Sequence, residues 1–200
     1  MIYVCDNFLS EKEFSELREL IPKRYLKKRF DESRIDGAIE PIRYEFHTRI
    51  GNYEEGSKFL GPASFPAIEK LIETFHNLDI PAVSYSLWFA YMFTGMRNIA
   101  HRDGALRHSI QKHTYTTMLY TSEWEKGWGG ELVFGDPVFN DKGRMIEVVP
   151  KQIIEPLPNR QVIWSRDEAH EVYVVKHPDK DFVRCSFGSG WSSVDDRPSK

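Results

Sequence analysis

From Val83 onward, the chain reads as a succession of short β-strands separated by turn residues. The segments are rich in β-branched and aromatic residues, and Gly, Pro, Asn or Asp stands between them. We predict strands over residues 83–93, 115–121, 131–134, 152–155, 161–165, 171–175 and 182–188. Many short strands with such turns are typical of a sandwich or jelly roll, in which two sheets enclose the interior.

The first part of the chain predicts helices instead. Ser10 and Glu13 form a capping box, Leu9 and Phe14 match a hydrophobic staple, and Pro22 ends the helix. A second helix follows Pro66 and has an apolar face made of Ile68, Leu71, Ile72 and Phe75. We therefore expect a mainly β protein with flanking helices.

Between the two helices, residues 42–50 alternate between apolar and polar side chains, as in a strand with one buried face. Residues 23–29 hold five cations, which we interpret as a solvated stretch, with contact to nucleic acid or an acidic substrate as the less favoured alternative. Residues 31–41 are polar and predict a surface loop.

Composition excludes several classes of protein. The 200 residues suit one domain, and the net charge of −3 shows no basic signature for nucleic acid. No run of eighteen apolar residues exists and the start does not resemble a signal peptide, so we expect a soluble cytoplasmic protein without a membrane partner. Cys5 and Cys185 lack a metal-binding spacing and are expected to be reduced, buried thiols.

Three residues form a candidate metal site. His101 and Asp103 are separated by one residue, so on a strand both side chains point to the same face. His170 lies at the start of a later β-rich run and can approach them from a second strand. Two neutral imidazoles and one carboxylate form the facial triad of non-haem Fe(II) oxygenases, which leaves positions open for substrates.

Motifs around the triad occur in an order that resembles the prolyl 4-hydroxylase-like branch of the Fe(II)/2-oxoglutarate-dependent dioxygenases. The resemblance covers roughly residues 83–193, with a weaker similarity at residues 6–10. It implies a double-stranded β-helix, which is a cupin-like jelly roll, with His170 and Arg184 on consecutive strands of facing sheets. We expect a single oxygenase domain, residues 1–200, with N-terminal helices and substrate-side loops in 1–80 and the β-helix core in 81–195. The matching motifs are Tyr91, His101-Arg102-Asp103, Trp124, Gly129-Gly130, His170-Glu171-Val172, Arg184-Cys185-Ser186 and Trp191.

The same resemblance assigns roles to individual residues. His101, Asp103 and His170 match the iron ligands. The distal carboxylate of 2-oxoglutarate is expected on Arg184, with hydrogen bonds from Tyr91, Ser186 and Tyr120. On the substrate side we expect Trp191 near the entrance and Arg102, which must face away from the metal unless its strand twists or ends there.

The resemblance implies hydroxylation of an aliphatic C–H with Fe(II), O2 and 2-oxoglutarate, and with ascorbate as an additional candidate reductant. Retention of Asp103 favours hydroxylation over halogenation. A prolyl residue of a peptide or protein is the favoured substrate, and a free amino acid or other small metabolite is the alternative. Two other classes remain open: a non-catalytic metal- or ligand-binding barrel, and a hydrolytic Zn(II) centre.

Overall fold

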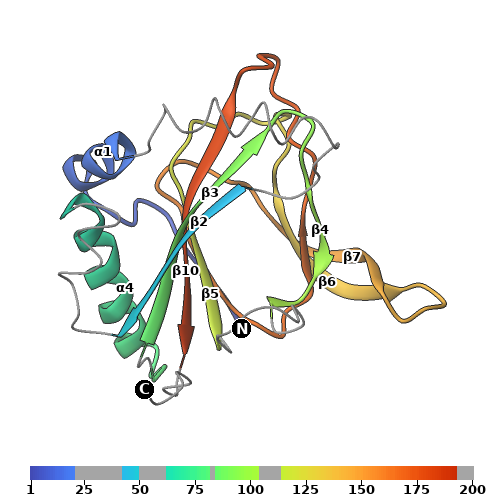
Figure 1. Cartoon of the computed structure of the whole chain (residues 1–200), viewed down its shortest axis with the longest axis horizontal. Helices are drawn as coiled ribbons and strands as arrows, with labels where there is room; N and C mark the ends of the chain where they lie inside the picture. The colour runs from blue at the N-terminus through green and yellow to red at the C-terminus, as the bar shows by residue number, and fades with distance from the viewer. Residues whose placement is uncertain (21–41, 50–61, 82–83, 104–113, 193–200) are drawn as a thin grey trace.

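The computed structural model of the chain describes residues 1–20, 42–49, 62–81, 84–103 and 114–192. Two antiparallel sheets dominate it, and the helices lie outside one of them (Figure 1). The expected jelly-roll architecture is therefore confirmed. The cation-rich stretch, the loop at residues 31–41 and Pro22 lie outside the described residues.

The larger sheet has the strand order β1-β8-β5-β10-β3-β2. In this order its members are β1 (Ile2–Cys5), β8 (Gln161–Ser165), β5 (Tyr115–Tyr120), β10 (Val183–Ser192), β3 (Ser84–Phe93) and β2 (Ile42–Arg49). The smaller sheet has the order β4-β9-β6-β7, with β4 (Asn98–His101), β9 (His170–Val172), β6 (Leu132–Phe139) and β7 (Met145–Ile154). Each strand that we predicted appears, although several bounds differ.

The largest differences in strand length are in β6 and β7. The sequence predicts only their buried ends, whereas the two strands continue as a hairpin that projects from the sheet (Figure 1). Much of this extension is exposed on both faces, so it lacks the alternation by which strands are recognised. Conversely, β9 is shorter than the predicted strand over residues 171–175. It contains three residues, because the chain leaves the sheet after Val172.

Within the described residues, two helices cover the outer face of the larger sheet. Helix α1 (Glu11–Glu19) begins with the expected capping box, in which Ser10 Oγ accepts from the Glu13 amide and the Glu13 carboxylate accepts from the Ser10 amide. Helix α4 (Phe65–Asn77) follows a short 3-10 turn, η2 (Pro62–Ser64). Of the predicted apolar face, Ile68, Leu71 and Phe75 are buried and Ile72 is partly buried. Together with Ala67, they pack with β3, β5 and β10 in the main hydrophobic core.

Cys5 and Cys185 are both free thiols, as predicted, although only Cys185 is buried and Cys5 is partly exposed. Within the described residues, no helix combines the length and the apolar character needed to cross a membrane.

Asn159 connects the N-terminal segment to the turn before β8. Its φ of 60° lies in the left-handed region, which Asn enters more readily than most residues. Its side chain accepts a hydrogen bond from the Leu9 amide at 2.9 Å and donates one to the Leu9 carbonyl at 2.8 Å. The residue is 8% exposed, so water has little access to replace these hydrogen bonds if the side chain is removed.

We expect Asn159→Ala to lower the free energy of unfolding by about 3 kcal/mol, because it leaves two backbone groups unpaired and places a Cβ at positive φ. Asn159→Gly removes the same bonds without the backbone strain, and its loss should be smaller by about 1 kcal/mol. Urea unfolding of the two variants measures the difference. Equal losses would contradict the strain component, and an unchanged stability in both would contradict the bonding.

Candidate metal centre and adjoining cavity

A cavity between the two sheets is lined by side chains from both of them. Along β3 and β10 the lining residues are even-numbered, because alternate residues of a strand face opposite sides of its sheet. Most of the lining side chains are apolar, and a smaller number of polar side chains lie among them. The apolar contributors include Trp88, Met92, Met118, Leu132 and Val172.

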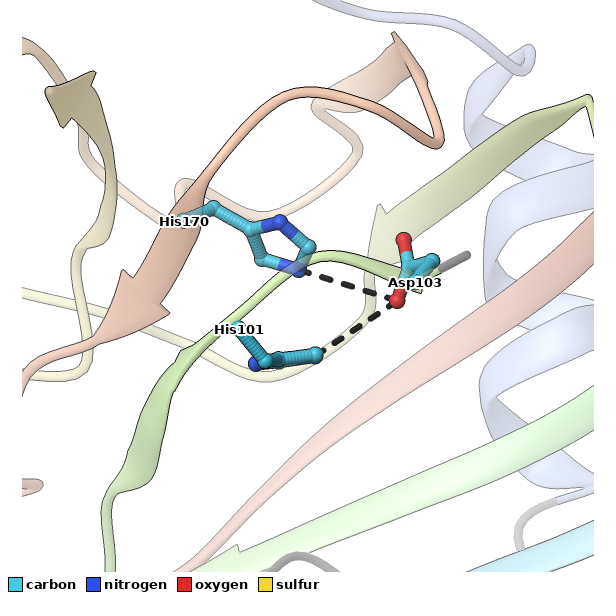
Figure 2. Close-up of side chains that lie close together, drawn as sticks. All are labelled: His101, Asp103 and His170. Carbon is cyan, nitrogen blue, oxygen red and sulfur yellow. Dashed lines mark ion pairs between the residues drawn. The ribbon is translucent and has the colours of Figure 1, made fainter. Parts of the chain in front are cut away.

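Asp103 and His170 line this cavity, and His101 lies close to both of them (Figure 2). One potential ligand atom of each lies within 4.8 Å of the others. Asp103 Oδ1 is 3.5 Å from His101 Nε2 and 3.8 Å from His170 Nε2. Two nitrogens and one oxygen thus surround a common point, which is the donor set of the facial triad.

The backbone determines which nitrogen each histidine presents. His101 Nδ1 lies 2.7 Å from the Ile99 carbonyl, and His170 Nδ1 lies 3.0 Å from the Glu168 carbonyl. A carbonyl only accepts, so each Nδ1 carries the proton and each Nε2 keeps its lone pair. Both free lone pairs belong to the nitrogens that approach Asp103, so the two rings are already in the tautomer that a metal requires.

The two histidines lie on strands, as the sequence predicts, but Asp103 does not. His101 and His170 are paired across β4 and β9. Asp103, however, follows the end of β4 in a helical turn and does not lie on the strand. The partner strand β9 begins at His170, so the ladder offers no further pairing beyond His101. Arg102 therefore follows the strand end, the exception that the sequence analysis allowed for, and it is not among the residues that line the cavity.

The Asp103 carboxylate is ionised in this environment. Burial alone would raise its pKa, but the neighbouring His170, His101 and Thr116 outweigh burial and hold the pKa well below its usual range. Trp164 Nε1 also donates to Asp103 Oδ2 at 3.0 Å. An ionised carboxylate is the form that binds a cation.

Arg184 is placed in the same cavity and has no acidic partner within the part of the chain that the structure describes. The residue is 6% exposed, and its guanidinium lies over the Tyr120 ring at 4.9 Å from the centroid. Its Nη1 contacts the Met92 sulfur, a weak acceptor, and its buried Nε makes no hydrogen bond. Burial lowers the pKa of Arg184, and Tyr120 opposes that change. A buried guanidinium with unused donors is suited to bind a carboxylate.

Ser186 and Tyr120 line the cavity beside Arg184, where the sequence analysis expected them. Their pairing across β10 and β5 places both on the same face of the larger sheet. Burial raises the pKa of the Tyr120 phenol, while the charge of Arg184 lowers it, so the neutral hydroxyl is the form present. Gly130 leaves the space for Arg184, because a Cβ there would lie 3.2 Å from Arg184 Cδ.

Two predicted site residues lie elsewhere. Tyr91 and Trp191 are both fully buried in the core that joins the larger sheet to the helices. Trp191 stacks at an angle against Phe75 of α4, with ring centroids 4.9 Å apart. Both residues are odd-numbered on strands whose even-numbered side chains face the cavity. The expected contacts of Tyr91 with the co-substrate and of Trp191 with the substrate are therefore wrong.

Other cavity residues were missed. Trp88, Met92, Asn98, Thr116 and Trp164 all line it. The strand periodicity assigns Trp88 and Met92 to the face opposite Tyr91 and could have found them. Trp164 had no comparable signal, since its partner Asp103 is 61 positions away.

We expect the metal-free protein to bind one Mn(II) or Fe(II) ion per chain. His170→Ala should weaken this binding more than ~100-fold, because the loss of a ligand exceeds the effect of losing a group that merely orients one. Calorimetric titration measures the affinity. His76→Ala serves as control, since His76 is exposed on α4. Equal affinities in the two variants would contradict the site.

Comparison with solved structures shows the same fold. A viral collagen prolyl hydroxylase of Paramecium Bursaria Chlorella virus-1, solved as a 2OG complex, has a TM-score of 0.62 and 17% identity, with 97% of this chain and 96% of that chain covered. A Pseudomonas putida prolyl-4-hydroxylase has a TM-score of 0.58 and 18% identity, with 97% and 93% covered.

A third similar structure is a prolyl hydroxylase from Trichoplax adhaerens in complex with a peptide fragment of the hypoxia inducible factor oxygen degradation domain. Its TM-score is 0.51 and its identity 16%, with 95% of this chain and 82% of that chain covered. At these identities the likeness concerns the fold. A comparison with curated protein sequences finds no significant match.

The sequence profile of one family matches residues 87–191, which hold the three candidate ligands, Arg184 and most of the cavity. This match covers more than half of the chain. The chain belongs to the 2OG-Fe(II) oxygenase superfamily and is a dioxygenase that uses Fe(II) and 2-oxoglutarate.

Proposed function

We propose that this dioxygenase hydroxylates a prolyl residue of a peptide or protein. The observation that supports this substrate is the fold similarity to prolyl hydroxylases over 97% of the chain. One of the similar proteins was solved with a peptide bound, so the same architecture can present its metal to a residue within a longer chain. Membership of the superfamily supplies the reaction type, and the proposal concerns the substrate.

The residues of the cavity fit the cofactor and the co-substrate. His101, Asp103 and His170 would hold Fe(II) through Nε2, one carboxylate oxygen and Nε2. When bound, iron and 2-oxoglutarate supply the oxidative decarboxylation to succinate and CO2 that drives hydroxylation of a C–H bond.

The remaining groups bind and orient the co-substrate and exclude water. Arg184 would hold its distal carboxylate through paired N–H donors, and the Ser186 and Tyr120 hydroxyls are available beside it. Apolar side chains such as Leu132 and Val172 line the same cavity. A low-dielectric wall strengthens the ionic contact at Arg184.

We expect Arg184→Ala to weaken 2-oxoglutarate binding ~10-fold or more, because a charge-assisted hydrogen bond contributes about 1.5–3 kcal/mol. Arg184→Lys keeps the charge but loses the planar fork, so its affinity should fall between those of Arg184→Ala and the parent protein. Calorimetry of the Mn(II)-loaded protein measures the affinity. Arg18→Ala is the control, since Arg18 pairs with Glu123 at the surface. Unchanged affinity in Arg184→Ala would remove Arg184 from the site.

The substrate class is tested by incubation with Fe(II), 2-oxoglutarate, ascorbate and a library of proline-containing peptides. We expect a mass increase of one oxygen atom, which fragmentation assigns to proline, and none in matched peptides with alanine at that position. His170→Ala should form no product. Oxygen insertion only into free amino acids or other metabolites would contradict the peptide proposal and leave the dioxygenase assignment intact. If the protein forms no succinate from 2-oxoglutarate, either with the peptides or without them, that result would instead favour a non-catalytic barrel.

A further inference from the structure

Asp103 is held in place differently from the two histidines of the metal site. The two histidines are held by a strand ladder and by backbone carbonyls. Asp103 lies beyond the end of β4 and has no ladder partner among the described residues. Its carboxylate can rotate about two side-chain bonds, so other groups must orient it.

Two side chains of the larger sheet face this carboxylate in the cavity. Trp164 Nε1 donates to Asp103 Oδ2 at 3.0 Å. Thr116 lines the cavity with Asp103 and contributes to the low pKa of its carboxyl group. Thr116 and Trp164 are directly paired across β5 and β8, so they reach the cavity side by side from one face.

Trp164 is held firmly by its surroundings. It is 2% exposed, its ring lies 5.7 Å from that of Phe134 and 5.3 Å from that of His170, and both contacts are edge-on. The indole therefore packs against one metal ligand while it donates to another. A planar, buried side chain loses little further freedom when it makes such a bond.

The contact also separates the two carboxylate oxygens. Oδ2 accepts from the indole, whereas Oδ1 is the oxygen nearest to both histidine Nε2 atoms. The two oxygens of an ionised carboxylate are equivalent, so the bond to Trp164 fixes the plane of the group: while one oxygen accepts from the indole, the other faces the histidines. Oδ1 is thus the atom offered to the metal.

We propose that Thr116 and Trp164 form a clamp that positions Asp103 for monodentate binding of the metal. The clamp links the larger sheet to the ligands of the smaller sheet, so the relative position of the two sheets enters the geometry of the metal site. Both are positioning residues that act through Asp103. The inference rests on the metal site of the superfamily and is independent of the substrate proposed above.

The test measures binding of Mn(II) alone to the metal-free full chain, with the free ion followed by electron paramagnetic resonance. Trp164→Phe keeps the ring and removes the donor, and Thr116→Val keeps the shape and removes the hydroxyl. Each should weaken Mn(II) binding ~10-fold, the lower end of the effect known for groups that orient metal ligands. Thr116→Ser should restore the affinity, because it restores the hydroxyl.

Trp191→Phe is the matched control. Trp191 also donates its indole N–H to a side-chain oxygen, that of Ser189 at 2.6 Å, but it lies on the opposite face of the larger sheet. Its Mn(II) affinity should equal that of the parent protein. A general loss of packing would affect Trp191→Phe as much as Trp164→Phe.

The Co(II)-loaded protein gives a second measurement. Visible absorption of Co(II) reports its ligand geometry, so Trp164→Phe and Thr116→Val should shift the bands while Trp191→Phe and Thr116→Ser leave them in place. Circular dichroism establishes that each variant is folded, and if Trp164→Phe is not, the Thr116 pair decides. Parental affinity and spectrum in the folded clamp variants, or an equal loss in the Trp191 control, would overturn the proposal.

Discussion

The two-residue alternation along β10 separates the hydrophobic core of this protein from its chemistry. Cys185, Phe187 and Trp191 face the helices and pack in the main core, whereas Arg184 and Ser186 face the cavity. The strand lies between β5 and β3 in the larger sheet, so both neighbours follow the same alternation. A shift of one residue in this strand would exchange the two sets and remove Arg184 from the site.

Much of the metal centre could be predicted because its signals are local. His101 and Asp103 are separated by a single residue, and the β-rich run after His170 predicts the strand on which His170 lies. Arg184 could be placed in the same cavity only through the resemblance to a family, since its position depends on two sheets that meet. The helices were also predictable, because their caps and apolar faces are written within single segments.

The remainder depended on tertiary structure. Tyr91 was assigned to the cavity through the resemblance to the family, although its place in β3 puts it on the face with Phe89 and the helices. Nothing in the sequence distinguishes Trp164 from an ordinary core aromatic, and its hydrogen bond to Asp103 joins β8 to the segment that follows β4. Such contacts between distant segments carry no periodic signal. The exposed hairpin of β6 and β7 escaped prediction for the opposite reason, since it lacks a consistently buried face.

The charges of the cavity are better explained by ligand binding than by stability. An ionised carboxylate and an unpaired guanidinium both lower folding stability when they leave water, unless a partner compensates. Asp103 accepts a hydrogen bond from Trp164 and lies beside two histidines, whereas the Arg184 guanidinium lies over the Tyr120 ring, contacts the Met92 sulfur and forms no salt bridge with a described residue. The cavity therefore presents one anionic and one cationic side chain in a largely apolar lining. A bound metal ion would compensate the charge of Asp103, and the distal carboxylate of a bound oxoacid would compensate the charge of Arg184. The presence of both charged groups in one cavity therefore supports a site for the two ligands together.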